Sequence, residues 1–496
     1  MKKTVLLYNG VSTTFADLDD DPCLSLMALS AYLKQIGYCV EVVHDRHTDN
    51  ELRLLLQDCT MVGFSVYTGT GLMRTVKMAK RIRHLAPDIP LTWGGYHPTL
   101  EPRQVLDSPY ADFVVRGEGE FTLEELLKCL QEGKPEGALA QIKGLSFRKK
   151  NGEVVNNPAR ISGNINEFPM LDYDLYDNYF RKKTAVQYMT SRGCPFDCRF
   201  CSSTAFNHLH GARFRQLSLA RIFQDIDILI KRYNPKMIEF LDDNFLSSVM
   251  MIKGFIEGYR QRDYQFTWMA RSRCDLFAGL DDSVIKELRD IGLLKVDFGV
   301  ESGSQRILDF LRKRLQLPDV MTTINKMARN GLWAFCTFIN GVPGETLEEV
   351  YASIRLRNEI KRVSPRSKID FYVLTPFPGT ELLKDCYEYG FQLPDSIEEY
   401  IDFNQRQFKA PWMTRKHQHI VTAISWASFV DMYDPEPKSP WWFKALFGVF
   451  KADANWRFQH CAFRFAPEFL IADWIYEKKS RSYRKNTGVG QDVLQT

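Results

Sequence analysis

Three closely spaced cysteines are the residues best suited to do chemistry. Cys194, Cys198 and Cys201 stand in the segment SRGCPFDCRFCSS, with three residues between the first two and two between the last two. Thiolates this close, on a loop that carries Gly193 and Pro195, can converge on one metal centre, but they supply only three ligands. The spacing therefore predicts a centre with one open coordination position, which a substrate or cofactor can fill directly, as at catalytic zinc.

Other interpretations of the cysteines remain open at this point. A structural zinc site would need His208 or His210 as a fourth ligand, although zinc more often binds paired C-x2-C units. The three thiols could also simply be buried. Core packing is what we expect of the remaining cysteines, since a free Cys behaves as a small hydrophobe. These are Cys23, Cys39, Cys59, Cys129, Cys274, Cys336, Cys386 and Cys461.

The cysteine segment resembles the signature of the radical S-adenosylmethionine (SAM) superfamily, in which an aromatic residue, here Phe200, precedes the third Cys. The resemblance implies a 4Fe-4S cluster on Cys194, Cys198 and Cys201, with SAM chelating the unique iron and Phe200 near the adenine. It also implies that an electron from the reduced cluster cleaves SAM to methionine and a 5′-deoxyadenosyl radical, which abstracts hydrogen. In such enzymes the protein supplies binding and orientation.

Later segments match the superfamily pattern in the same order. The resemblance assigns Asp242 and Asp243 of EFLDDNF to the SAM amino group, Arg271 of WMARSR with Glu301 and Ser302 of GVESGS to its carboxylate or ribose, and Gly341 of INGVPGET, with TPFPGTEL further on, to the adenine side. Any one Pro-Gly motif is weak, because these residues mark ordinary turns. Helix capping is the alternative role for either aspartate.

Ahead of the cysteines, three segments resemble the cobalamin-binding domain that is fused to one large radical SAM class. They are GFSVYTGT, LTWGGYHPTL and VVRGEGE, so that the resemblance covers roughly residues 1 to 400. Paired glycines after a strand let the backbone approach a bulky ligand, and hydroxyl groups can bond its polar tail. The candidate cobalamin-binding residues are Ser65, Thr68, Thr70, Gly94, Gly95 and His97.

The segment DRHTDN looks like the D-x-H-x-x-G loop that supplies an axial histidine to cobalt. Asn50 replaces its glycine, however, and the segment follows the second predicted strand instead of the first. We therefore expect His47 to be an exposed loop residue and cobalamin to have no axial histidine. The alternative for the whole domain is a scaffold that has lost cobalamin or that binds substrate, because a fold does not determine its ligand.

The elements that must position these residues follow from hydrophobic periodicity. Strands are expected at 4–9, 39–45, 61–67, 90–95 and 112–117, separated by amphipathic helices such as 25–37. This alternation predicts an α/β fold, with residues 1–140 forming a doubly wound, Rossmann-like domain that binds its ligand at the carboxyl ends of the strands. Residues 141–183 are expected to be a linker that contains a hairpin at Asn151-Gly152.

A second strand and helix series begins at about residue 184. Its strands are expected at 185–191, 237–243, 266–272, 295–302, 334–341 and 370–376. Six such units predict a partial (β/α)6 TIM-like barrel over residues 184–400, with its active site at the C-terminal ends of the strands.

Residues 401–496 are expected to be helical and rich in aromatic side chains. The tryptophans are Trp412, Trp426, Trp441, Trp442, Trp456 and Trp474, and the basic run KKSRSYRK follows them. Such a region can close over an apolar substrate as a lid, or lie on a membrane surface with its basic residues near the headgroups.

The composition is that of an ordinary globular protein and excludes few classes of function. The 496 residues are 45% hydrophobic and 25% charged, with a net charge of +4, too small a surplus to indicate nucleic-acid binding. The start MKKTVLLYNG resembles a strand more than a signal peptide, and the apolar stretch IVTAISWASFV is much shorter than the roughly 20 residues of a membrane span. We expect a cytoplasmic protein with reduced thiols.

Three functions remain in competition. The first is a cobalamin-dependent radical SAM methyltransferase that acts on an unactivated carbon of a small, hydrophobic substrate. The second is an oxidative cyclase or rearrangement enzyme of the same architecture, without net methyl transfer. The third is a non-catalytic metal-cluster sensor or scaffold. For the enzymes we expect an electron donor such as flavodoxin or ferredoxin, no nucleic-acid partner, and peripheral membrane contact as a further feature.

Overall fold

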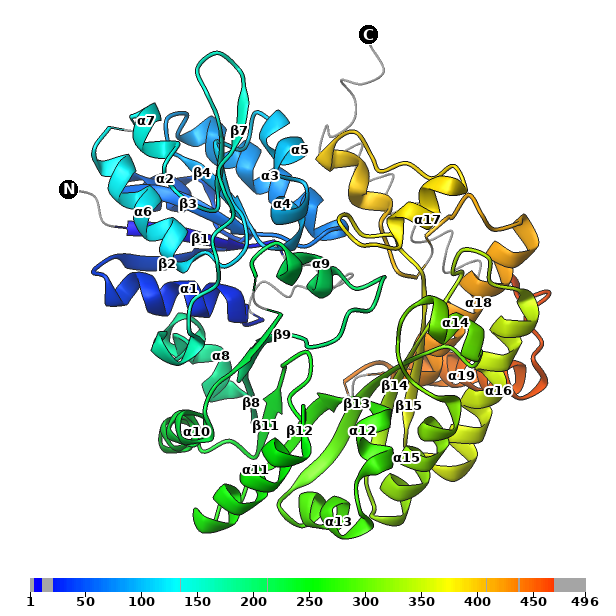
Figure 1. The fold of residues 1–496 in the computed structure, drawn as a ribbon. Helices are drawn as coiled ribbons and strands as arrows, with labels where there is room; N and C mark the ends of the chain where they lie inside the picture. Colours follow the sequence, from blue (N-terminus) through cyan, green and yellow to red (C-terminus); the bar gives the residue numbers. More distant parts are fainter. Residues whose placement is uncertain are drawn as a thin grey trace.

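The computed structural model describes residues 4–10, 21–133, 135–211, 213–406, 408–435 and 438–467. Two parallel sheets with their covering helices form most of the chain. The first domain (blue and cyan in Figure 1) lies against the open side of a larger strand and helix layer (green), and the short helix α9 (Ser202–His208) lies between them. Helices near the C-terminus pack beside the larger sheet.

The first sheet has the strand order β2-β1-β3-β4-β5-β6-β7. Strands β1 to β5 are parallel, while β6 and β7 are antiparallel. The strands are β1 (Thr4–Asn9), β2 (Cys39–Val43), β3 (Cys59–Ser65), β4 (Leu91–Gly94), β5 (Phe113–Val115), β6 (Leu145–Arg148) and β7 (Val154–Asn156). The doubly wound fold predicted from the sequence is thereby confirmed.

Helices cover both faces of this sheet because successive strand residues point to opposite sides. In β1, Leu6 joins one apolar cluster with residues of α2 and α3, while Val5 and Leu7 join another with residues of α1 and α6. The helices are α1 (Leu24–Gln35), α2 (Asp49–Gln57), α3 (Thr70–Leu85), α4 (Tyr96–Leu100), α5 (Pro102–Asp107), α6 (Glu120–Gln131) and α7 (Glu136–Leu139).

The predicted hairpin exists, and it adds to the first sheet. Strand β6 pairs antiparallel with β5, and β7 pairs with β6. Residues 144–156, placed in the expected linker, thus extend the N-terminal sheet. After them the chain runs through the 3-10 turns η1 (Ile165–Glu167) and η2 (Tyr173–Tyr176) and helix α8 (Asp177–Lys182) to the second sheet.

The second sheet is the predicted six-stranded open barrel, and all its strands are parallel. Its order, β15-β14-β13-β12-β11-β8, follows the sequence from one edge to the other. The strands are β8 (Ala185–Tyr188), β11 (Met237–Phe240), β12 (Thr267–Ser272), β13 (Leu293–Glu301), β14 (Trp333–Asn340) and β15 (Lys368–Val373). Strands β8, β11 and β12 lie within the ranges expected from the sequence, whereas β13 and β15 begin two residues earlier than expected and β14 begins one residue earlier.

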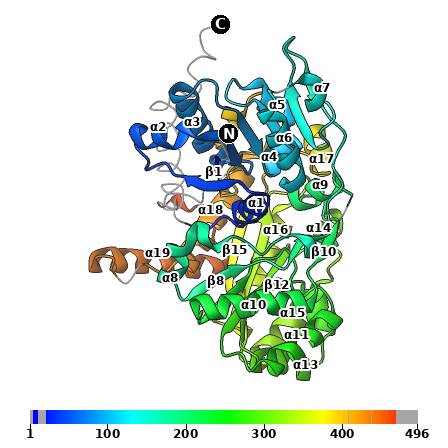
Figure 2. The same ribbon diagram turned by 90° about the vertical axis from the view of Figure 1, so that its left-hand side faces the viewer.

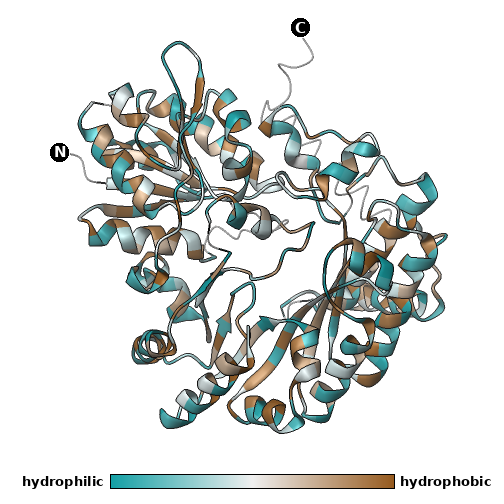
Figure 3. Ribbon diagram, viewed as in Figure 1, coloured by the Kyte–Doolittle hydropathy of each residue, from teal (hydrophilic) through white to brown (hydrophobic). Residues whose placement is uncertain are grey.

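Helices pack on the outer face of this sheet, so that apolar residues (brown in Figure 3) concentrate along its strands and hydrophilic ones (teal) on the outer helix surfaces. These helices are α10 (Leu219–Tyr233), α11 (Val249–Gln261), α12 (Cys274–Gly279), α13 (Asp282–Asp290), α14 (Gln305–Phe310), α15 (Leu317–Arg329), α16 (Leu347–Val363) and α17 (Leu383–Glu388). Their N-termini follow the carboxyl ends of the strands, where an active site is expected.

A small ribbon that the sequence did not predict lies between the two sheets. Strand β9 (Ser191–Gly193) pairs antiparallel with β10 (Phe214–Gln216). The cysteine segment and helix α9 form the connection between these two strands, so the ribbon holds both ends of that connection.

Two long helices follow the 3-10 turn η3 (Ile397–Asp402): α18 (Arg415–Met432) and α19 (Trp441–His460). The buried side chains of Arg357 and Asp431 form an ion pair of 2.7 Å between α16 and α18, and Asn358 donates to the carbonyl of Phe458 in α19. These contacts anchor the second half of α19, while the helix extends away from the body of the molecule in Figure 2. Trp474 and the basic run 478–485 lie outside the described residues.

Among the helices that the structure describes, none is both long and apolar enough to cross a membrane.

Candidate functional site

The three cysteines lie on the loop that leaves β9. Cys194 directly follows this strand, Cys198 is buried, and Cys201 precedes the first turn of α9, with its backbone N–H bonded to the carbonyl of Cys198 at 3.2 Å. Gly193 is required before the first cysteine, since its φ is +81° and a Cβ there would lie 2.2 Å from the carbonyl oxygen of Arg213.

Burial raises the pKa of the Cys194 thiol to about 11, and the nearby Asp243, Cys201 and Cys198 raise it further. The pKa of Cys198 is also raised by burial, while Lys313 opposes this shift. The three thiols are therefore close enough to influence one another's ionisation. Among the described residues, no group of three His, Cys, Asp or Glu side chains stands in the geometry of a metal site.

The cysteine loop is fixed on the side opposite β9. Arg199 donates to Asp385 of α17 at 2.5 Å, its backbone N–H bonds to the carbonyl of Leu311, and its own carbonyl accepts from Leu382. Phe200 is half-buried against the barrel core. These contacts fix the middle of the loop, between Cys198 and Cys201, against the barrel.

The two candidate histidines of the zinc alternative have other surroundings. His208 is exposed at the end of α9. His210 is buried, its Nδ1–H donates to the carbonyl of Arg160 at 3.2 Å, and burial lowers the pKa of its imidazole. The zinc interpretation gains no support from these contacts.

The neighbouring aspartates after β11 differ in role. Asp242 is fully buried, and its Oδ1 accepts from the backbone and hydroxyl of Thr190 and from the hydroxyl of Ser191. Burial raises the pKa of Asp242 to about 6. Asp243 is exposed, and its surroundings in the protein raise the pKa of its carboxyl, an effect that the nearby Ser203 and Arg271 partly offset. Asp242 thus fixes the corner between β8 and β9, and Asp243 faces the site beside Cys194.

Arg271 extends from the end of β12 into the same space. It is exposed, donates to the carbonyl of Leu241 at 3.5 Å, and lies close enough to Asp243 and Tyr372 for its charge to oppose the rise that burial causes in the pKa of both. An accessible cation at this strand end suits the carboxylate of a ligand.

Glu301, at the end of β13, is bound to a residue that sequence reasoning missed. Its Oε1 lies 2.8 Å from Nζ of Lys313, and both side chains are nearly buried, with 7% and 12% exposed. Glu301 also has a φ of +69°, rare for a non-glycine residue. Lys313 lies close to Cys198, since its charge lowers the pKa of that thiol. Nothing in the segment LRKRL marks this lysine as a site residue.

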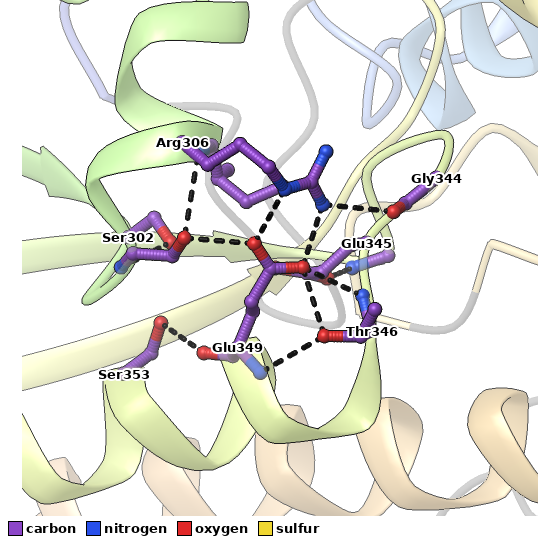
Figure 4. Close-up of polar contacts among 10 residues, drawn as sticks. Ser302, Arg306, Gly344, Glu345, Thr346, Glu349 and Ser353 are labelled. Carbon is purple, nitrogen blue, oxygen red and sulfur yellow. Dashed lines mark hydrogen bonds and ion pairs between the residues drawn. The ribbon is translucent and has the colours of Figure 1, made fainter.

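Ser302 is fully buried and accepts a hydrogen bond from the backbone of Ser304. It belongs to a structural corner in which the Ser304 hydroxyl and the Arg306 guanidinium both donate to Glu349 (Figure 4). Thr346 caps α16 through the same Glu349. This network fixes the turn after β13, which explains Ser302 without a ligand.

Gly341, after β14, is covered by the C-terminal region. Its φ is +79°, its N–H donates to Glu345 at 2.6 Å, and its carbonyl accepts from the indole of Trp412 at 2.8 Å. Burial raises the pKa of Glu345 to about 8. The region after residue 400 therefore packs over the end of this barrel strand, as the lid interpretation requires.

In the first domain, some candidate residues line a cavity and others are buried beneath its wall. Thr68 and Thr70 line a cavity, whereas Ser65 is buried and shares a hydrogen bond with Ser25. His97 is fully buried behind Thr68, 3.1 Å from its hydroxyl, and burial lowers the pKa of the imidazole to about 3. His97 is thus neutral and orients Thr68.

The glycines after β4 bring backbone segments together. Gly95 has a φ of +97°, and a Cβ there would lie 2.7 Å from the carbonyl oxygen of Val66. A Cβ on Gly94 would only reach 3.5 Å from the carbonyl of Val115. The close approach at Gly95 is therefore between two strand ends of the chain itself.

His47 stays within its own loop. It is partly buried, and its Nδ1 accepts from the backbone N–H of His44 at 3.0 Å. Asp45 is also occupied, by Tyr8 and Arg74. These contacts agree with an interpretation of His47 as a loop residue, although its side chain is less exposed than expected.

A cavity of about 440 Å³, partly open to solvent, lies between the carboxyl ends of the first sheet and the mouth of the barrel. Its size is typical of ligand sites. Tyr67 follows β3 and stacks on Tyr96 with ring centroids 5.1 Å apart, and Ser202 is the residue after Cys201. The cavity is lined by Gly10, Tyr67, Thr68, Thr70, Gly71, Tyr96, Ser202, Tyr372, Phe377, Phe403, Asn404, Gln405 and Arg406.

These residues fit the implied cofactors. Three thiols on one loop supply the donor set of a cluster with an open iron, and Asp243 with Arg271 offers one acceptor and one donor for an amino acid group beside it. Asp242 keeps an Oδ2 atom without a partner, the polar atom that could also reach a ligand. On the other side, hydroxyl groups follow β3 at the point where a doubly wound sheet binds its ligand.

Two family descriptions match the chain: the Radical SAM superfamily over residues 188–357 and the B12 binding domain over residues 20–127. The uncharacterized methyltransferase PH0819 of Pyrococcus horikoshii is 33% identical over 366 residues, which cover 70% of this chain and 76% of the relative. The anaerobic magnesium-protoporphyrin IX monomethyl ester cyclase of Rubrivivax gelatinosus is 26% identical over 406 residues, 78% of this chain and 68% of that protein.

Among solved structures, the radical SAM methyltransferase TsrM from Kitasatospora setae, with cobalamin and a 4Fe-4S cluster bound, superimposes with a TM-score of 0.65. It is 16% identical, and the match covers 93% of this chain and all of that one. The two folds are therefore alike. The two matched domains imply a 4Fe-4S cluster, SAM and cobalamin as cofactors. The chain belongs to the radical SAM superfamily, in the class that carries an N-terminal B12-binding domain.

Proposed function

We propose that this radical SAM enzyme transfers a methyl group to an unactivated carbon of a small substrate, with cobalamin as the carrier. The observation that carries the proposal is the shared cavity: Thr68 and Thr70 line it from the B12-binding domain, and Ser202 lines it beside Cys201. When bound, the cluster and SAM supply a carbon radical and cobalamin supplies a methyl group. A single cavity lined from both domains suits the meeting of the two.

The chain's own residues have separate tasks in this proposal. Cys194, Cys198 and Cys201 hold the cluster, while Asp243 and Arg271 orient SAM against its open iron. Of the three thiols only that of Cys198 is buried, while Cys194 and Cys201 are partly exposed, as ligands that face an open site should be.

The cavity lining also defines the substrate. Rings of Tyr372, Phe377 and Phe403 supply apolar surface, and Asn404 and Gln405 supply neutral polar groups. Arg406 also lines the cavity, but its guanidinium is bound to Asp370 at 2.6 Å through both of its Nη atoms. With that charge compensated, the site suits a substrate that is uncharged and partly apolar, in agreement with the hydrophobic substrate expected from the sequence.

The products test this proposal. The anaerobically reduced, reconstituted enzyme, supplied with SAM and an extract of its host, should form S-adenosylhomocysteine together with 5′-deoxyadenosine, and the label of methyl-labelled SAM should enter a small molecule. A cyclase or rearrangement enzyme would form 5′-deoxyadenosine without transfer of the label. The similarity to a magnesium-protoporphyrin cyclase supports that second function, and the 33% identical methyltransferase supports the first. A sensor or scaffold would form neither product.

The enzyme needs a one-electron donor of low potential, and we propose a flavodoxin or ferredoxin. Replacing a chemical reductant with a reduced flavodoxin should support formation of 5′-deoxyadenosine, and a rate no higher than without reductant would exclude that carrier.

We also propose peripheral contact with an anionic membrane through the first half of α19. In residues 441–450 no side chain is buried, and this stretch, WWFKALFGVF, has one charged residue. Trp441 is 80% exposed and Val449 66%. Exposed aromatic and aliphatic side chains of this kind are typical of interfacial helices. The enzyme should sediment with anionic vesicles, less so in high salt, and Trp441→Ser with Trp442→Ser should abolish this. Equal recovery in the supernatant with and without vesicles would leave only the lid role.

A further inference from the structure

The segment VVRGEGE of the B12-binding domain contacts the ribbon that carries the cluster loop. Arg192, in the middle of β9, lies 2.6 Å from Glu120 and 3.1 Å from Glu118 through its two Nη atoms. Arg215 of β10 also binds Glu118 through both Nη atoms. Two carboxylates of one domain thus hold two guanidinium groups of the other.

The register of the ribbon places two positive charges opposite each other, and these carboxylates compensate them. Arg192 and Arg215 are directly opposite each other in the antiparallel β9 and β10 pair. Like charges at opposed positions destabilise a strand pair unless an opposite charge compensates them. Glu118 contacts both arginines and supplies that charge from the other domain.

Burial strengthens the contacts. The side chain of Glu120 is 3% exposed, those of Glu118 and Arg192 15% and 20%. Burial lowers the pKa of the Arg192 guanidinium, but Glu120 and Glu118 more than offset this and hold that pKa above its usual range. The backbones also lie close together, since a Cβ on Gly117 would be 2.5 Å from the ring of His210. The segment 117–120 therefore packs closely against the connection between β9 and β10 as well as against the ribbon.

Arg192 is two residues from Cys194, with only Gly193 between them. The far arm of the same loop, which carries Cys198 and Cys201, is held by a different element, because Arg199 binds Asp385 of α17. The position of Cys194 relative to Cys198 and Cys201 thus depends on where the contacts of Arg192 with the B12-binding domain place β9.

We propose that Glu118 and Glu120 are positioning residues for the cluster: through Arg192 and Arg215, the B12-binding domain sets the position of Cys194 and thereby the binding of SAM at the open iron. This role belongs to the radical SAM chemistry of the chain and does not depend on methyl transfer. It gives the segment VVRGEGE a function at the cluster as well as in its own domain.

The test compares Glu118→Gln and Glu120→Gln with Glu125→Gln in the full-length holoenzyme. Glu125 is the matched control, because it lies on helix α6, which begins at Glu120, and forms an ion pair of 2.6 Å with Arg160 instead of with an arginine of the ribbon. Each protein is assayed for iron, retained hydroxocobalamin, the electron paramagnetic resonance spectrum of the reduced cluster with and without SAM, and 5′-deoxyadenosine formation.

We expect both Gln variants at the ribbon to keep iron and cobalamin, to show a changed spectral response to SAM, and to form 5′-deoxyadenosine about 10²-fold more slowly, the scale of a misplacement of about 1 Å. Glu118→Asp, which keeps the charge between the arginines, should recover most of the response. The more exposed Glu118 carries the test if Glu120→Gln is insoluble. A spectral response and rate equal to those of Glu125→Gln would overturn the proposal, as would a joint loss of iron and cobalamin, which indicates unfolding alone.

Discussion

The hydroxyl groups of Tyr96 and Ser203 lie 3.0 Å apart and join the B12-binding domain to the helix that follows the cluster cysteines. The Tyr96 ring lies between Tyr67 of its own domain and Phe206 of α9, with centroid distances of 5.1 and 4.8 Å. One side chain therefore connects the cavity wall to the cluster helix by a polar and an aromatic contact. Removing each contact separately shows what it contributes.

Tyr96→Phe should lower the free energy of unfolding by about 1 kcal/mol, the usual contribution of one hydrogen bond. Tyr96→Ala should cost more, because the ring contacts on both sides are also lost. Denaturant unfolding of the anaerobic protein measures both changes. Equal stabilities of Tyr96→Phe and the original chain would show that this hydrogen bond is made equally well with water.

Gly95→Ala should weaken cobalamin retention, whereas Gly94→Ala should not. At Gly95 the positive φ and a contact of 2.7 Å with Val66 force the backbone of the cavity wall to move, next to Thr68. At Gly94 the nearest atom is 3.5 Å away, an ordinary contact. Hydroxocobalamin retained through gel filtration distinguishes the two variants. Equal retention would mean that the wall adapts without affecting the cofactor.

Stability should fall as the pH drops below about 6.5, in part because of His97. The folded pKa of His97 is about 3, lowered by burial from 6.5, so below pH 6.5 the unfolded chain takes up a proton that the folded chain does not. The contribution of His97 to the free energy of unfolding is therefore present above pH 6.5 and is lost as the pH falls. About 1 kcal/mol of it is lost between pH 7 and pH 5.5. His97→Asn should remove this part of the pH dependence. Identical slopes for both proteins would place the proton uptake elsewhere.

Lys313→Met should destabilise the chain by about 3–5 kcal/mol, because it leaves Glu301 buried without its partner at 2.8 Å. The double variant with Glu301→Gln should recover part of this loss, since no unpaired charge is then buried. Denaturant midpoints of the single and double variants give the coupling. If the double variant is as unstable as the sum of the single ones, the two side chains do not act as a pair.

The sequence predicted both sheets because their strands contain continuous apolar runs at regular intervals, as in Val5 to Leu7 or Trp333 to Cys336. It did not predict β9 and β10, because three-residue strands carry no periodicity and Arg192 resembles a surface residue. The pairing of the hairpin with β5 depends on tertiary contacts that no local pattern encodes.

The site was predictable where chemistry fixes the spacing, as in the three cysteines. It was less predictable where neighbours in sequence point in different directions. Asp242 and Asp243 look equivalent, but only the structure separates a buried structural carboxylate from an accessible one. Lys313 escaped notice because its partner Glu301 comes from the end of another element, and Ser302 and His97 look like ligand contacts until their burial is known.

Cys198→Ala offers the most direct test of the account, because it removes one cluster ligand while leaving the B12-binding domain intact. Iron, bound hydroxocobalamin and 5′-deoxyadenosine formed from SAM under reduction should be measured on the same preparations of this variant and the original chain. The account predicts about four irons per chain, bound corrinoid and 5′-deoxyadenosine for the original chain, and only the corrinoid for the variant. Stoichiometric zinc in place of iron, or 5′-deoxyadenosine from the variant at an undiminished rate, would contradict it.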